Sequence, residues 1–393
     1  MAFLSGSLTF ERFRILTPEV AMFGLEHIER MQELTAGEYQ PNSEDAVHLG
    51  FLGGSHLFDQ TFDLEKNVFN DALHFAMRID TNQVPSAIRK AWIQMELAAL
   101  MAENPDRKPN KREKEQAREA VEQRVEAEVA SGKYHRMSQV PALWDAPTSM
   151  MYFGASSSTA CSSFADLMTH AFEMELDRIG SGYLAGQWAQ SHGTTAALDD
   201  VRPTVFHPEH TGGDNAWASS DALHPDFLGN EFLLWLWHTL EHDGDTLKLS
   251  DDTEVTVMFS KSLTLECPAG ISGRESISAE IPTRLPEALE AIRSGKLPRK
   301  AGLTMVRLGQ QYELTLQAES FSVSGAKVQK DEDAQGREVF EGRIEAIRQL
   351  SETIDLMFEV FCRVRLSDGW EEQVQRISQW VSPLHPERQR NAA

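Results

Sequence analysis

The sequence predicts an α+β protein, with mixed strands and long helices in an extended, multi-lobed chain. Three observations carry this prediction. Apolar and polar residues alternate in several short segments, as in strands with one buried face. In other segments apolar residues recur at spacings of three and four, as in amphipathic helices. Strands and helices also follow one another without the strict alternation and glycine signatures of a doubly wound sheet, which favours α+β over α/β.

The composition is that of an acidic globular protein. The chain has 393 residues, 41% apolar content and a formal net charge of −23, and this length and apolar content suffice for substantial cores. The pI near 5.0 argues against a wholly basic nucleic-acid binder. A local basic groove remains open, because net charge does not report where the cations lie.

The N-terminus and the cysteines indicate the compartment. Glu11, Arg12 and Arg14 interrupt the apolar residues of the N-terminal segment before a signal-peptide core or a membrane span could form. The cysteines lie about a hundred residues apart without Cys-x-x-Cys spacing, which predicts buried thiols in a reducing compartment: Cys161, Cys267 and Cys362. We therefore expect a cytoplasmic protein without membrane contact.

Residues 1–189 predict an N-terminal α+β region with a protruding charged helix. Its first helix has a candidate N-cap in Thr17, directly before Pro18. The expected elements are a strand over "SLTFERFRI", a helix over 18–34, a half-buried strand over 71–80, a helix from Pro85, a helix from Asn110 to Gly132, and a strand, small-residue turn and helix over 148–172.

Residues 190–226 mix Gly, Ser, Asp, His and Pro without periodicity, which predicts a loop or linker and a candidate boundary. Beyond it, residues 227–393 predict a C-terminal α+β region with a closing helix. Its expected elements are a buried helix over "FLLWLWHTL", strands near 246–249, 254–259, 262–267 and 275–281, a helix at 285–294, strands near 300–308, 311–318 and 320–323, and a long amphipathic helix near 338–364.

The charged helix that begins after Asn110 has a candidate capping box in Asn110 and Glu113. Its charges have two interpretations. Lys111, Lys114 and Arg118 form one stripe beside a stripe of glutamates, which is typical of a solvated helix with weak ion pairs. However, Lys111 and Arg112 lie in the first turn, where the helix dipole favours acids, so their position suits contact with an anion better than helix stability.

Two further segments carry clustered cations. In "GKYHRMSQ", Gly132 ends the charged helix and is expected to expose Tyr134 between Lys133 and Arg136, a pairing that suits a phosphate backbone or a base stack; the alternative is a tyrosine that anchors the loop. No acid lies between 291 and 312, a window with five cations: Arg293, Lys296, Arg299, Lys300 and Arg307. The alternative is a basic surface strand that balances acids elsewhere in space.

Four histidines offer the strongest catalytic alternative, a metal-dependent hydrolase. His238 and His242 are four residues apart on an expected helix, and "HPEH" adds His207 and His210. The spacing does not match His-Glu-x-x-His, because the glutamate precedes the second histidine. No nucleotide-binding loop, nucleophile elbow or cysteine-nucleophile signature appears. We therefore expect no enzymatic activity and no cofactor.

The order of these segments resembles the RdgC family of bacterial recombination-associated proteins. The resemblance is carried by the N-terminal strand and helix, "GFLGGSH", "VPSAIRKAWIQME", "NKREKEQAREAVEQRV", "RMSQVPALWDAPTSMMYF", "FADLMTHAF", "LGNEFLLWLWHTLE", "EALEAIRSGKLPRKAGLTM" and "FCRVRLSDGW". It spans most of the chain, and it depends on the ordered set rather than on a single motif. This chain is longer, carries the insert at 190–226, and has Tyr134 where the family usually has phenylalanine.

The resemblance implies a non-enzymatic, cytoplasmic, nucleoid-associated protein that binds double-stranded DNA with little sequence preference. It also implies a ring-shaped homodimer around a basic hole, and restraint of the RecA recombinase in recombination or replication. With the cation patterns it gives these expected DNA-binding residues: Arg89, Lys90, Lys108, Lys111, Arg112, Lys114, Arg118, Lys133, Tyr134, Arg136, Lys296, Arg299 and Lys300.

Overall fold

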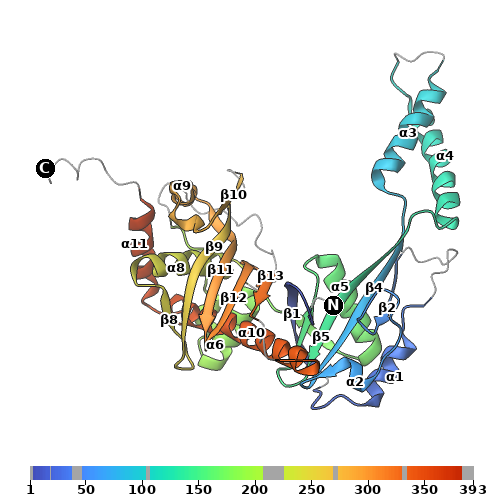
Figure 1. Cartoon of the computed structure of the whole chain (residues 1–393). Coiled ribbons are helices and arrows are strands. Elements are labelled where there is room, and N and C mark those ends of the chain that lie inside the picture. Colours follow the sequence, from blue (N-terminus) through green and yellow to red (C-terminus); the bar gives the residue numbers. More distant parts are fainter. Residues whose placement is uncertain are drawn as a thin grey trace.

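The computed structural model describes residues 3–17, 19–37, 47–102, 107–206, 225–268, 273–329 and 334–382. Thirteen strands among them form one open antiparallel sheet in the order β10-β9-β11-β12-β13-β1-β6-β5-β4-β2, with β3, β7 and β8 paired to β4, β1 and β9 (Figure 1). The α+β class is therefore confirmed. None of the helices in these ranges combines the length and apolar content that a membrane span requires.

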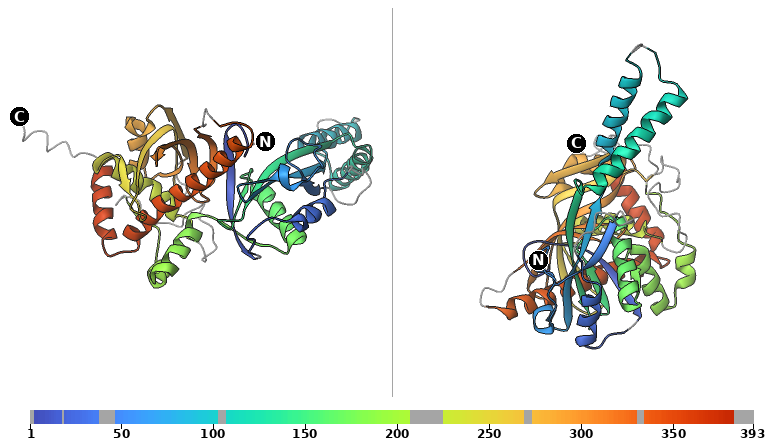
Figure 2. Two further views of the ribbon diagram at one scale, coloured as in Figure 1. Left: turned by 60° about the horizontal axis from the view of Figure 1, so that its bottom comes forward. Right: turned by 90° about the vertical axis from the view of Figure 1, so that its right-hand side faces the viewer.

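The N-terminal part of the sheet is covered by helices on one face (Figures 1 and 2). Its core contains stacked aromatic rings, such as Phe153 on Phe164 with centroids 4.1 Å apart. The elements are β1 (Leu8–Thr17), α1 (Leu25–Glu33), β2 (Val47–Leu52), α2 (Leu64–Asn67), β3 (Val68–Phe69), β4 (Ala72–Asn82), α3 (Ser86–Leu100), α4 (Lys111–Ala130), β5 (His135–Asp145), β6 (Met150–Phe153), α5 (Ser158–Phe172) and β7 (Glu175–Arg178).

The C-terminal part packs its strands on the helices α8 and α10. Helix α8 contains the "FLLWLWHTL" segment and is buried along most of its length, as the sequence predicts. The elements are α6 (Ser181–His192), α7 (Thr195–Asp199), α8 (Leu228–His242), β8 (Thr246–Lys248), β9 (Glu254–Glu266), β10 (Arg274–Ala279), η1 (Pro282–Arg284), α9 (Pro286–Arg293), β11 (Leu297–Arg307), β12 (Gln310–Gln317), β13 (Val323–Val328), α10 (Arg337–Arg365) and α11 (Trp370–Val381). All three cysteines are buried, as expected.

The expected start of the first helix was wrong. Thr17 remains in β1, where it pairs with Glu175, so it does not cap a helix; Pro18 lies outside the described residues. The helix begins at Leu25, after Gly24 in extended conformation. The Gly24 N–H donates to Nδ1 of His27 at 3.1 Å, which satisfies a group at the helix start and fixes the later boundary.

The strand boundaries of the C-terminal part also differ from expectation. The two strands expected over 254–259 and 262–267 are one strand, β9, which continues through Lys261 at φ 66°. Opposite this irregularity is Gly302, where a Cβ atom would meet the Ser260 carbonyl oxygen at 2.0 Å. The strand expected at 320–323 begins only at Val323, because a turn precedes it in which Gln317 N–H donates to the Ser322 carbonyl.

Strand β4, expected to be half-buried, is buried at every position from Ala72 to Arg78, and half-buried and buried positions alternate from Ile79 to Asn82. Asn67, the last residue of α2, connects the loop after β2 to β4: its Nδ2 donates to the carbonyls of Gly53 and His74, at 2.9 and 2.7 Å. The expected linker at 190–226 contains the end of α6 and the short helix α7, and its residues 207–224 lie outside the described ranges.

Helix α10 and strand β1 join the two parts of the sheet. Strand β1 pairs with β13 on one side and with β6 on the other, so the sheet continues from one part to the other. Arg348 of α10 reaches the fully buried Asp145 of β5 at 2.5 Å. Arg12 of β1 reaches Asp355 of α10 at 2.7 Å. The helix is therefore fixed to the N-terminal strands by buried charge pairs.

Replacement of Arg348 by Met should destabilise the protein by about 3–5 kcal/mol, because it leaves the buried Asp145 carboxylate without its cation. Urea unfolding measures this change. The matched control is Arg363→Met, at an exposed position of the same helix, which should change the free energy of unfolding by less than about 0.5 kcal/mol. Equal effects of the two substitutions would contradict the assignment.

A second prediction concerns pH. His74 is 2% exposed, its Nε2 has no hydrogen-bond partner among the described residues, and burial, followed by nearby positive charge, lowers its pKa to about 4. Because the unfolded histidine titrates near 6.5, this group contributes stability above that pH and loses it as the pH falls from 6.5 towards 4.

Unfolding free energies of the wild type and of His74→Gln, measured at pH 7 and pH 4.5, should therefore differ in their pH dependence. The wild type should lose about 2 kcal/mol more than the variant over this interval. His170→Gln, at an exposed histidine, should keep the wild-type pH dependence. An unchanged pH dependence in His74→Gln would show that His74 does not contribute it.

Candidate nucleic-acid interface

A helical hairpin projects from the sheet. Strands β4 and β5 pair along eleven residues each, from Ala72 with Asp145 to Asn82 with His135, and helices α3 and α4 form the connection between them. Figures 1 and 2 show this hairpin standing away from the rest of the molecule. A two-helix element held at one end by a paired strand ribbon exposes most of its surface to solvent.

A narrow seam holds α3 against α4. Trp92, Ala117 and Val121 are buried between the helices. The Arg124 guanidinium lies 4.2 Å from the Trp92 ring centroid, a cation–π contact. At the base, Asn82 donates from Nδ2 to the Val129 carbonyl at 2.7 Å. These contacts fix the hairpin direction relative to the β4–β5 ribbon. Sequence reasoning did not find Arg124 or Asn82 as positioning residues.

The start of α4 has the expected capping box. Asn110 accepts from the Glu113 N–H, and Glu113 accepts from the Asn110 N–H, both at 2.9 Å. Arg107 also pairs with Glu113, and these hydrogen bonds, first that of Arg107, lower the pKa of Glu113 to about 2. Glu113 therefore stays ionised, and its negative charge is compensated by Arg107. Lys111 and Arg112, in the same turn, are exposed.

Charge is polarised along the hairpin. Residues 107–118 contain six cationic and two acidic residues, a net charge of +4, whereas residues 119–130 carry −3. Arg89 pairs with Glu122, Arg107 with Glu113, and Arg124 covers Trp92. Within the described ranges, the remaining six hairpin cations are exposed and have no ion-pair partner: Lys90, Lys108, Lys111, Arg112, Lys114 and Arg118. The structure thus brings the α3 and α4 cations of the expected site onto one projecting element.

The residues after α4 are less available for a ligand than the sequence predicts, because Lys133 is paired with an acid and Tyr134 is partly buried. Gly132 adopts φ 71° and ends the helix, as predicted. Lys133 is paired with Glu128 at 2.7 Å, a contact that raises the pKa of Lys133, and its Nζ lies 5.6 Å from the Tyr134 ring centroid. Tyr134 is half-buried rather than fully exposed, whereas Arg136 is exposed on β5.

The cations near position 300 do not join the hairpin. Lys296 and Arg299 lie on or beside β11, which is separated from β5 in the sheet by β12, β13, β1 and β6. Lys296 is 6% exposed and pairs with Glu275. Arg299 lies between Glu266 and Glu319, at 3.2 and 2.8 Å.

Acids distant in sequence thus supply the charges that the sequence window lacks: Glu275 on β10, Glu266 on β9 and Glu319 in the turn after β12. Arg307 likewise pairs with Asp251, at 2.5 Å, and with Glu352, at 2.7 Å. Lys300, in contrast, is exposed, and no acid pairs with it within the described ranges. The stretch from 291 to 312 contains no acid, but three of its five cations pair with acids from elsewhere in the fold.

The histidines of the alternative reading are only partly described. His207 and His210 lie outside the described residues. The rings of His238 and His242 stack with centroids 4.4 Å apart, and His242 Nδ1–H donates to the His238 carbonyl at 2.9 Å. Burial, followed by His242, lowers the pKa of His238 to about 4. Within the described ranges, no three His, Cys, Asp or Glu side chains are arranged to hold a metal ion.

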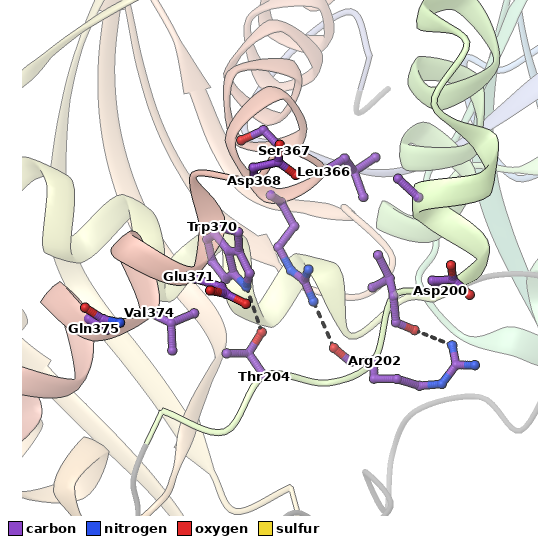
Figure 3. Close-up of a pocket in the computed structure, with 13 residues that line it drawn as sticks. Asp200, Arg202, Thr204, Leu366, Ser367, Asp368, Trp370, Glu371, Val374 and Gln375 are labelled. Carbon is purple, nitrogen blue, oxygen red and sulfur yellow. Dashed lines mark hydrogen bonds between the residues drawn. The ribbon is translucent and has the colours of Figure 1, made fainter.

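A cavity of about 770 Å³ lies between the segment after α7, the end of α10 and α11 (Figure 3). Arg365 forms its inner wall: Nε donates to Glu231 at 2.6 Å and Nη2 to the Arg202 carbonyl at 2.8 Å, and the guanidinium lies over the Trp370 ring. These contacts hold the segment after α7 against α10. The lining also contains acids, namely Asp200, Asp368 and Glu371, so its mixed charge does not favour an anion as the hairpin does.

Truncation of the hairpin seam should loosen the hairpin alone. Trp92→Ala removes a buried side chain and should cost about 3 kcal/mol of local stability, which speeds amide exchange in α3 and α4 about a hundredfold. Hydrogen exchange measures this by segment. Met95→Ala, at a 62% exposed position of α3, serves as control and should leave exchange unchanged. Equal acceleration in β4 and β5 would contradict a locally stabilised hairpin.

Comparison with protein families and with curated proteins adds no relative to this description. No protein-family model matches the chain, and no curated protein matches it either.

Proposed function

We propose that this protein binds double-stranded DNA without sequence preference and that the α3–α4 hairpin makes the principal contact. The supporting observation is the net charge of +4 over residues 107–118 on a projecting element of a chain whose total is −23. DNA releases condensed counterions when cations neutralise its phosphates, and this release supplies most of the free energy of sequence-independent binding.

The hairpin geometry favours phosphates over bases. Lys111 and Arg118 lie seven positions apart on α4, a helical rise of about 10 Å, which equals roughly three base-pair steps measured along the duplex axis. The cations on this stretch lie on exposed helix surface, and the aromatic residue of the hairpin, Trp92, is buried. Phosphate contacts position a protein on DNA but carry no sequence information. Binding should therefore be equal for different duplexes.

The acidic remainder of the chain contributes to the orientation of binding. Residues 119–130 carry a net charge of −3. The cations expected between 291 and 312 are largely paired with acids, as at Lys296 and Arg299. DNA phosphates are repelled by such surfaces over about one Debye length. A duplex would thus approach the far half of the hairpin first, with Lys300 and Arg136 as further exposed contacts.

The resemblance to the RdgC family supports the remaining parts of the proposal. On that basis the protein is non-enzymatic, acts as a homodimer that closes into a ring around DNA, is associated with the nucleoid, and restrains RecA-dependent recombination or replication. Strand-exchange assays with RecA test the last point: added protein should slow exchange, and unchanged exchange at saturating protein would contradict it.

Charge reversal in the hairpin tests the DNA contact. Replacement of Lys111, Lys114 and Arg118 by Glu should weaken binding to every duplex at least tenfold at about 0.1 M salt, because three phosphate contacts are lost. The slope of log K against log salt should fall in magnitude by about 3. Fluorescence anisotropy with two unrelated duplexes measures both quantities.

The control carries the same charge change away from the hairpin, as Arg30, Lys248 and Arg363 to Glu; all three are exposed. It should keep the wild-type salt slope. Absence of wild-type binding at low salt, or equal weakening by both triple variants, would contradict the proposed contact.

A further inference from the structure

The cavity between the segment after α7, the end of α10 and α11 has the size of a small-molecule site, at about 770 Å³. Figure 1 shows α11 and the α3–α4 hairpin at opposite ends of the molecule. The charges that line the cavity are therefore not explained by the proposed DNA contact, and their arrangement points to a separate ligand.

Arg365 offers a hydrogen-bond donor at the inner wall of this cavity. Its side chain is 8% exposed. Nε donates to Glu231 and Nη2 to the Arg202 carbonyl, whereas Nη1 forms no hydrogen bond in the described part of the chain. Nη1 is also not one of the enclosed side-chain atoms that lack a partner, so it reaches the cavity. A guanidinium N–H group in this position favours an oxygen acceptor, above all a carboxylate.

The rest of the polar lining favours a cation. Glu231 compensates the charge of Arg365, so Arg202 alone opposes three acids, and the lining carries a net charge of −2. All three acids are exposed, and within the described ranges none of them has an ion-pair partner: Asp200, Asp368 and Glu371. Such a lining attracts positive charge.

Apolar side chains complete the lining. Val201, Leu366 and Val374 are half-buried and belong to the cavity wall. Figure 3 shows Val374 and Glu371 on one side of the cavity and Asp200 on the other. The methylene groups of a long basic side chain pack on such apolar surface while the charged end stays at an acid.

We propose that this cavity binds a basic α-amino acid of the arginine or lysine type. The α-carboxylate accepts a hydrogen bond from Nη1 of Arg365, the methylene groups pack on the apolar wall, and the cationic side chain is bound by the acids. An inorganic anion lacks the cation that the net charge favours, and a simple diamine leaves Nη1 without an acceptor. A ligand with both groups satisfies both parts of the lining.

Isothermal titration calorimetry on the full chain at low salt tests the ligand chemistry. L-arginine should bind at one site per chain. Agmatine, which is arginine without the carboxylate, and L-citrulline, which has a neutral side chain, should each bind about tenfold more weakly, because each lacks one charge-assisted contact. Equal affinity for the three compounds, or no binding of L-arginine at millimolar concentration, would overturn the proposal.

A pair of neighbouring substitutions on α11 tests the location. Glu371→Gln should weaken L-arginine binding about tenfold, because one acid of the lining loses its charge. The control Glu372→Gln removes the same charge from the next position, which is exposed but does not line the cavity, and should keep the wild-type affinity. Equal weakening by both substitutions would indicate a diffuse charge effect and reject the site.

Arg365→Lys tests the carboxylate contact. This substitution keeps a cation beside Glu231 but removes the free N–H group, so it should weaken L-arginine binding about tenfold and leave agmatine binding unchanged. Equal weakening of both ligands would mean that Arg365 only supports the cavity wall, which contradicts the assigned contact. The Glu371 and Glu372 variants decide the question if Arg365→Lys does not fold. All these titrations contain no DNA, so their outcome is separate from that of the DNA-binding assays.

Discussion

The structure depends on the attachment of helix α10 to the N-terminal strands. Arg348 reaches Asp145 and Arg12 reaches Asp355, and in both pairs one partner is fully buried. Removal of one partner from such a pair leaves an uncompensated charge, which costs more than the intact pair contributes. These contacts, with the pairing of β1 to β13, keep the sheet continuous from the C-terminal edge to the ribbon that carries the hairpin.

This continuity gives the hairpin a fixed direction. Helices α3 and α4 extend from the β4–β5 ribbon, and their contacts with each other through Trp92 and Arg124 replace contacts with the body. The cost is a thin core, because few buried side chains hold the element. The benefit is a helix surface accessible on several sides, which a phosphate backbone requires when several contacts form together.

Much of the α-helical structure could be predicted from local signals. The capping box at Asn110 and Glu113 and the glycine at 132 located α4, and the apolar spacing from Ile344 to Phe361 located α10, because these signals act within a few residues. Helix α11, which begins at Trp370, was not predicted. The long strand β9 was divided in the prediction because its irregularity at Lys261 is tolerated only opposite Gly302, a partner distant in sequence.

In the candidate site, too, residues with local neighbours could be predicted and residues with distant partners could not. The sequence located the free cations of the hairpin, whose neighbours are mostly their own helix. It overestimated how free Lys296 and Arg299 are to bind an anion, because their acids come from β10, from β9 and from the turn at Glu319. Cross-strand pairs depend on sheet order, which local patterns do not encode. The same limit hid Arg365, whose partner Glu231 lies on α8.

The most direct test of the central claim is lysine footprinting of the unmodified protein with and without duplex DNA. The account predicts that acetylation of Lys90, Lys108, Lys111 and Lys114 is suppressed by DNA, whereas Lys248 and Lys327, which are exposed at 69% and 68%, react as before. Protection of Lys248 and Lys327 with unchanged reactivity on the hairpin would contradict it.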